Sequence, residues 1–102
     1  MWLDRVLTNP YPQSVAAFIR QADAIMGHDT VSRLAEIAAP THVIFGDEDI
    51  LTPPRYSHTL AEGIRGARLT TIAEVGHGIP AEAAEKFNRA ALAFLAQLHL
   101  KC

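Results

Sequence analysis

Residues 40–53 read PTHVIFGDEDILTP and carry most of the information on the fold. The run 41–45 is rich in β-branched and aromatic residues, which favour a β-strand, and Gly46 ends that run abruptly. An acidic loop follows, and Thr52 with Pro53 is typical of the N-cap and first turn of a helix. The stretch therefore predicts a strand, an acidic loop and a helix.

The same order repeats towards the C-terminus. Residues 67–73 predict a second strand, which is followed by the loop Gly76-His77-Gly78. Pro80 is predicted to open the last helix, whose buried face has apolar residues at helical spacing. These apolar residues are Phe87, Ala91, Phe94 and Leu98. Strands that alternate with helices indicate parallel pairing, so the fold class is α/β with two parallel strands and flanking helices.

The predicted sheet is too small to be stable alone. Parallel sheets have both faces covered, and a sheet of only two strands has an unpaired edge on each side. We therefore expect this sheet to be part of a larger one.

Two helices are predicted before the first strand. Ser14 is a suitable N-cap for a helix that runs to about residue 26, and Gly27 favours its end. A shorter helix is predicted from Asp29 onward. The first helix has an apolar stripe, which we interpret as packing on the core; the alternative is a lid element facing a substrate.

The predicted loops place acid and base chemistry at one edge of the sheet. Parallel strands end on the same side, so the acidic loop 46–53 and the histidine loop 74–78 are expected to meet there. An aspartate that accepts from Nδ1–H of a histidine fixes the imidazole tautomer and leaves Nε2 free as a general base.

These two loops resemble the C-terminal part of the α/β-hydrolase fold. In that family a strand is followed by Gly-x-x-Asp and then by a proline, as Gly46, Asp49 and Pro53 are here, and a Gly-His loop precedes the last helix. The resemblance implies that Asp49 is the catalytic acid and His77 the general base. It is strongest to cofactor-free esterases and to the enol-lactonase and haloperoxidase-like branch, so no cofactor or metal is expected.

The resemblance also implies a division of the chain. Residues 1–38 would be lid-derived and entry helices, and residues 39–102 the C-terminal part of the hydrolase core. Asp47 remains a competitor for the role of catalytic acid, and Glu48 a weaker one. The cluster of three acidic residues also leaves open a cation site, although acidic loop clusters are usually solvated.

The family's nucleophile has no counterpart in the sequence. In α/β-hydrolases a serine lies in a Gly-x-Ser-x-Gly turn, and the chain contains no such motif. Its serines, Ser14, Ser32 and Ser57, fall on or beside predicted helices. We therefore expect a C-terminal fragment of a serine hydrolase acting on carboxylic esters or lactones, inactive by itself.

Two other interpretations remain open. The chain could be a non-enzymatic interaction module, for example a homo-oligomer that pairs exposed strand edges. The same fold could also serve a dehalogenase, a carbon–carbon bond hydrolase or an acyltransferase.

Composition limits which partners and which compartment we expect for this protein. Of the 102 residues 49% are hydrophobic and 20% are charged, and the formal net charge of -2 gives no reason to expect binding to nucleic acid or to a membrane surface. The longest apolar stretch, 90–100, is too short to span a membrane, and the N-terminus does not resemble a signal peptide. The single cysteine, Cys102, cannot form an internal disulfide. We expect a soluble, cytoplasmic protein.

Overall fold

The computed structural model describes residues 2–100, and side chains within residues 3–98. Cys102 lies outside the described residues. The elements follow in the order α1 (Trp2–Leu7), α2 (Val15–Met26), the 3₁₀ helix η1 (Val31–Glu36), β1 (His42–Gly46), α3 (Pro54–Gly63), β2 (Arg68–Ile72), α4 (Ile79–Glu82) and α5 (Ala84–Leu100). Among the described residues, no helix has both the length and the apolar character needed to cross a membrane.

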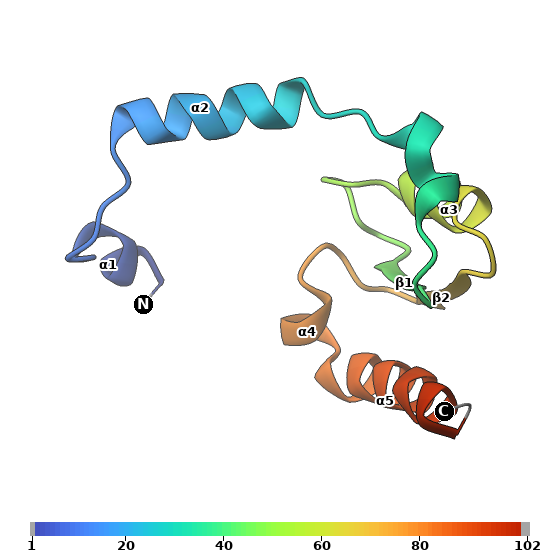
Figure 1. Ribbon diagram of the computed structural model, residues 1–102. Helices are drawn as coiled ribbons and strands as arrows, with labels where there is room; N and C mark the ends of the chain where they lie inside the picture. Colours follow the sequence, from blue (N-terminus) through green and yellow to red (C-terminus); the bar gives the residue numbers. More distant parts are fainter. Residues whose placement is uncertain (1, 101–102) are drawn as a thin grey trace.

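The centre of the fold is a sheet of two parallel strands, as predicted. β1 and β2 pair in register from His42 opposite Arg68 to Gly46 opposite Ile72. Helices α3 and η1 lie on one side of the sheet and α5 on the other (Figure 1). The α/β class and the flanking helices are therefore confirmed.

Each face of the sheet has a small apolar core. Ile72, Val75 and Ile79 form the cluster towards α5, together with partly buried residues that include Phe87. On the side of α3, Leu34 of η1 packs so closely on Gly63 that a Cβ there would lie 2.5 Å from Leu34 Cδ1. Both faces of the sheet are thus covered, while the outer edges of its strands have no neighbouring strand among the described residues.

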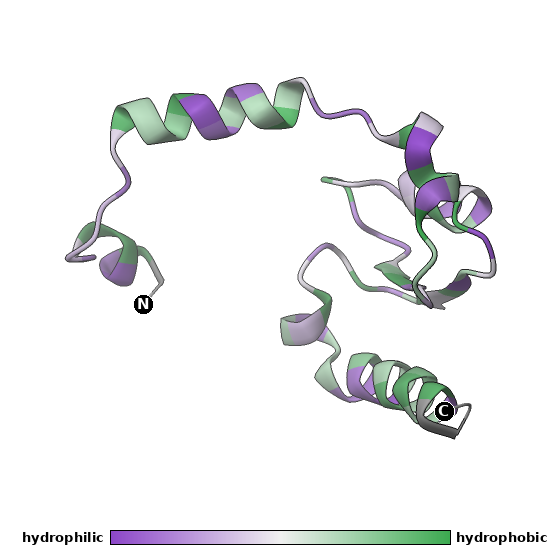
Figure 2. Ribbon diagram, in the orientation of Figure 1, coloured by the Kyte–Doolittle hydropathy of each residue, from purple (hydrophilic) through white to green (hydrophobic). Residues whose placement is uncertain are grey.

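Helix α2 has the predicted limits, but the interpretation that it packs on the core is wrong. Ser14 caps it by accepting a hydrogen bond from Ala17 N at 3.1 Å, yet the helix has no buried residue. Figure 1 shows α1 and α2 extending away from the sheet, and Figure 2 shows apolar residues along α2 with no other element beside them. The exposed large apolar residues of α2 are Val15, Phe18, Ile19, Ile25 and Met26.

Three predicted helices differ in the structure, and the one expected from Asp29 is the 3₁₀ helix η1, which begins at Val31. Helix α3 begins one residue later than expected, with Pro53 as its N-cap, so Thr52 does not cap it. The helix predicted from Pro80 is divided at Ala83, whose φ of -144° is not helical. The Thr52 hydroxyl is hydrogen-bonded to Asp49 in the preceding loop and does not cap α3, and the Glu82 carboxylate is hydrogen-bonded to Gly78 at the start of α4.

Candidate active site

The loops that follow β1 and β2 meet at the carboxyl end of the sheet. Asp47 N donates to Ile72 O at 3.1 Å, and Glu48 N donates to Val75 O at 3.0 Å. Gly46 permits this approach, because a Cβ at that position would lie 2.1 Å from Val75 O. The two loops are therefore joined through their backbones before any side chain contributes.

Asp49 is a buried carboxylate with several hydrogen-bond donors. Its side chain is 7% exposed, and Oδ1 accepts from Leu51 N at 2.9 Å and Thr52 N at 3.0 Å. Oδ2 accepts from the Thr52 hydroxyl at 3.0 Å. The backbone N–H of Thr52 is the main cause that lowers the pKa of Asp49 to about 2, with further contributions from His77 and the Thr52 hydroxyl, and burial opposes them. Asp49 is therefore ionised at neutral pH.

His77 faces this carboxylate. Its Nδ1 lies 3.0 Å from Asp49 Oδ2 and 3.4 Å from Thr52 Oγ1, while the histidine side chain is 56% exposed. Both hydrogen-bond contacts of the imidazole within the described part of the chain are through Nδ1. The Asp49 carboxylate favours the tautomer with hydrogen on Nδ1, so Nε2 is left with a lone pair that can take a proton.

The competing acidic residues lie elsewhere. Asp47 Oδ1 accepts from Glu74 N at 2.7 Å, and both Asp47 and Glu48 have exposed side chains. The structure thus brings Asp49, and neither of its acidic neighbours, to His77. Within residues 2–100, no group of three or more His, Cys, Asp or Glu side chains could hold a metal ion.

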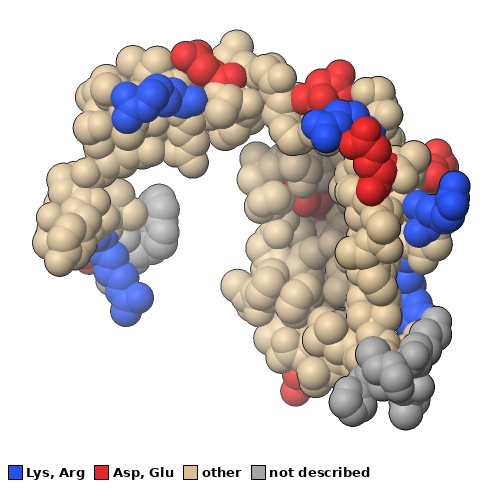
Figure 3. Space-filling model, in the orientation of Figure 1, with Lys and Arg blue, Asp and Glu red and all other residues tan. Residues whose placement is uncertain are grey.

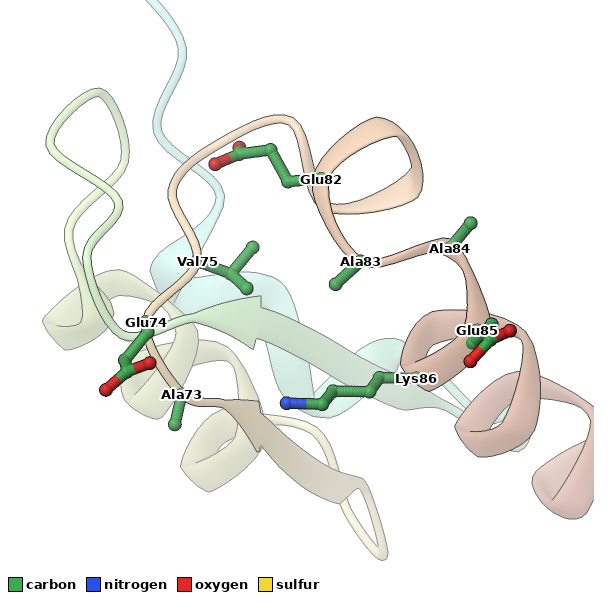
Figure 4. A pocket seen from close by; sticks show the side chains of 8 residues that line it. All are labelled: Ala73, Glu74, Val75, Glu82, Ala83, Ala84, Glu85 and Lys86. Atoms are coloured by element: carbon green, nitrogen blue, oxygen red, sulfur yellow. The ribbon is translucent and has the colours of Figure 1, made fainter.

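The three serines lie on or beside helices. Ser14 is the N-cap of α2, Ser32 lies in η1 and Ser57 lies in α3. None of them has a hydrogen bond to His77 among the described residues. A groove of about 400 Å³, lined by residues 73–75 and 82–86 (Figure 4), includes neither Asp49 nor His77.

Sequence reasoning missed the roles of Thr52 and Glu82 at this site. Thr52 was interpreted as a helix cap but donates to Asp49 through both its N–H and its hydroxyl. Glu82 lies in the segment predicted as one helix from Pro80, and its carboxylate accepts from the backbone on both sides of His77. The spacing of three residues from Asp49 to Thr52, typical of side chain–backbone turns, was the available signal for the first.

Acid titration provides a direct test of the Asp49 environment. Following the Asp49 carboxyl carbon by NMR, we expect a midpoint near 2 rather than the ordinary 3.8. Replacing Thr52 by valine removes the hydroxyl donor and should raise the midpoint, because the hydroxyl stabilises only the charged form. Since the pKa is lowered in the folded state, these contacts stabilise the fold above about pH 4, and this stabilisation is lost as the pH falls towards 2.

Thr59→Val is the matched control, because the Thr59 hydroxyl donates to Arg55 O within α3, away from the loop. A wild-type midpoint of 3.8 would contradict the observed hydrogen bonds to Asp49.

Similarity to known proteins supports a hydrolase. No family model matches the chain. It is 42% identical over 69 residues to a 2-hydroxy-6-oxononadienedioate/2-hydroxy-6-oxononatrienedioate hydrolase of Paraburkholderia xenovorans (strain LB400), covering 68% of this chain and 24% of that protein. The chain spans less than a third of the length of the curated relatives that it matches first.

Solved structures agree. A hydrolase from Pseudomonas aeruginosa PA01 matches 71% of this chain and 27% of its own, with 36% identity and a TM-score of 0.68. The enol-lactonase from Burkholderia xenovorans LB400 matches 78% of this chain and 30% of its own, with 28% identity and a TM-score of 0.73. In each case this chain corresponds to part of a larger fold.

Proposed function

Since the chain belongs to the α/β-hydrolase family and carries the C-terminal part of its fold, we propose that it supplies the catalytic acid Asp49 and the general base His77 of a serine hydrolase. The observation that supports this most directly is the 3.0 Å contact between Asp49 Oδ2 and His77 Nδ1, at the carboxyl ends of two adjacent parallel strands.

His77 would move the protons of both half-reactions, and Asp49 would stabilise the charged form of its imidazole. His77 Nε2 takes the proton from a serine hydroxyl as the oxygen attacks a carbonyl carbon, and Asp49 stabilises the imidazolium that forms. The imidazolium then gives this proton to the leaving oxygen, and an acyl-enzyme remains. Water, deprotonated by the same Nε2, hydrolyses the acyl-enzyme and returns the serine.

Carboxylic esters or lactones are the proposed substrates. The enol-lactonase among the similar structures acts, by its name, on a lactone, and the Paraburkholderia relative acts on a 6-oxo acid. Each of these compounds has a carbonyl carbon that a nucleophile can attack. The ester and lactone chemistry needs no cofactor, because the imidazolium formed when Nε2 takes the serine proton can protonate the alkoxide leaving group.

The proposed enzyme needs a second segment that carries the nucleophile and its oxyanion hole. The chain exposes 8314 Å², about 2,600 Å² more than a compact protein of its length. Its radius of gyration of 16.9 Å likewise exceeds the roughly 13 Å of a compact domain. An excess of this size is in the range that obligate interfaces bury. We therefore propose that the edges of β1 and β2 and the apolar face of α2 pack against the segment that bears the serine.

The alternative is a non-enzymatic homo-oligomer that pairs strand edges. The same exposed surface supports it, since two copies could also cover each other. The face shown in Figure 3 carries charges of both signs close together, so no single-sign patch on that face opposes self-association. Light scattering on the isolated chain measures its oligomeric state. A stable dimer, combined with no hydrolytic activity of the chain alone or in a chimera, would favour this alternative.

A chimera tests the proposed function. The chain is joined to the N-terminal part of the Paraburkholderia hydrolase, in place of the segment that it matches. We expect the chimera to hydrolyse a p-nitrophenyl ester or a simple lactone, whereas the chain alone gives no turnover. A folded chimera without activity would contradict the proposal. Turnover of the 6-oxo acid alone would mean that the substrate is such an acid and not an ester or a lactone. Activity of the isolated chain would contradict its need for a second segment.

A further inference from the structure

The loop between β2 and α4 is tied down before it reaches His77. Glu74 has a φ of 61°, which is uncommon for a residue other than glycine, and its N–H donates to Asp47 Oδ1 at 2.7 Å. The next carbonyl, Val75 O, accepts from Glu48 N at 3.0 Å. The acidic loop after β1 therefore holds the residues that precede Gly76.

On the other side of this loop a single carboxylate holds both neighbours of His77. Glu82 Oε1 accepts from Gly76 N at 3.3 Å, and Glu82 Oε2 accepts from Gly78 N at 3.0 Å. Figure 4 shows the Glu82 carboxylate inside the arc that the chain makes between Val75 and α4. Hydrogen bonds from N–H groups to a carboxylate are stronger than those to neutral acceptors.

The short helix α4 explains how Glu82 reaches back. Glu82 N donates to Gly78 O at 2.8 Å, so the residue lies one turn after the loop and its side chain points towards the start of the helix. The helix ends at once, because Ala83 leaves the helical conformation. Space beside the glycines is limited: a Cβ at Gly78 would lie 3.3 Å from Glu82 Oε2. The turn of α4 thus serves to return one carboxylate to the loop.

We propose that Glu82 is a positioning residue that holds His77 against Asp49. It has no hydrogen bond to the imidazole among the described residues; it acts through the backbone N–H groups of Gly76 and Gly78. An exposed side chain such as His77 would otherwise sample several orientations, and a base must lie within hydrogen-bond reach of its partners to transfer a proton. The catalytic importance of this positioning rests on the proposed function, but its physical basis does not.

The test is Glu82→Gln in the full chain, with two NMR readouts. An amide keeps the shape of the side chain but can accept from only one of the two N–H groups, since its nitrogen is itself a donor. We expect hydrogen exchange at Gly76 or Gly78 to become about tenfold faster, the effect of losing one charge-assisted hydrogen bond. We also expect the ring-nitrogen spectrum of neutral His77 to lose its preference for the Nδ1–H tautomer.

Glu85→Gln is the matched control, because it removes the same charge three residues later and Glu85 has no hydrogen bond to residues 74–78 in the described chain. It should leave both readouts unchanged. Faster exchange in the Glu82 variant with an unchanged His77 tautomer would overturn the proposal, since Glu82 would then only stabilise the loop. Unchanged exchange would overturn it as well.

If Glu82→Gln does not fold, Glu82→Asp keeps the charge, shortens the side chain by one methylene and is read by the same criteria. If neither variant folds, the wild-type chain decides: exchange at Gly76 and Gly78 as fast as at the exposed Gly66 overturns the proposal. None of these readouts uses activity. An inactive chimera with the expected NMR changes would contradict the proposed function alone, and an active chimera without them would contradict the role of Glu82 alone.

Discussion

Replacing His77 by alanine in the active chimera is expected to lower kcat/KM by roughly 10⁴-fold or more. In the proposed mechanism the imidazole takes the serine proton, so its removal leaves the reaction without its general base. Asp49 Oδ2 lies 3.0 Å from His77 Nδ1, on the side of the ring away from Nε2. The Asp49 pKa of about 2 makes this carboxylate a poor proton acceptor at neutral pH. Steady-state kinetics on an ester substrate measure the effect.

Two further variants separate catalysis from folding. Asp49→Asn keeps the size of the side chain but turns one oxygen into a donor, so His77 should adopt the wrong tautomer and the rate should fall by a comparable factor. His58→Ala is the control: His58 is an exposed residue of α3 that contacts the ring of Phe45 with centroids 5.5 Å apart. It should leave kcat/KM within about threefold of the original value, since surface substitutions have small effects. Full activity of the His77 variant would exclude it as the base.

Replacing Gly46 by alanine is expected to cause the largest loss of stability. An added Cβ would lie 2.1 Å from Val75 O and 2.6 Å from Gly76 O. Both are backbone atoms, so no side-chain rotation can relieve the clash, and the loop after β2 must move. Forcing extra atoms into a packed site costs about 1–3 kcal/mol and occasionally more. This shift would also separate His77 from Asp49, because His77 lies in the displaced loop and Asp49 lies in the loop after β1.

Urea denaturation measures the free energy of unfolding of the Gly46 variant, and the tautomer of His77 reports on the loop. Gly27→Ala is the control, since a Cβ there would have only Asp23 O nearby, at 3.4 Å, and the backbone is in the right-handed region. It should change stability by less than about 1 kcal/mol. A Gly46 variant as stable as the original chain would mean that the loops approach each other less closely than they do here.

Local patterns were sufficient to predict the strands and the two loops that follow them. A strand of β-branched residues ended by glycine, followed by acidic residues and proline, depends on interactions between near neighbours in the chain. Parallel strands then end at one edge of the sheet, so the acidic loop and the histidine loop were expected to meet, and the resemblance to α/β-hydrolases implied Asp49 and His77 as the pair. The structure joins their side chains directly.

The errors occurred where a side chain had more than one nearby partner available. Thr52 had a local role available as a helix cap, but its hydroxyl donates to Asp49. Glu82 was expected to lie within one long helix, but its carboxylate bonds to the loop and the helix divides at Ala83. The apolar stripe of α2 predicted burial, yet none of its residues is buried in the described chain.

By itself, the sequence determined that strands, helices and an acid–histidine pair belong at one sheet edge, because these follow from residue spacing along the chain. Only the tertiary structure decided which carboxylate the histidine meets: Asp49 lies within hydrogen-bond reach of His77, while Asp47 bonds to Glu74 N. It also decided that Glu82 holds the histidine loop. The physical reason is that a hydrogen bond requires its donor and acceptor atoms to lie close together, and the distances between these two loops are set by how closely the backbones approach at Gly46.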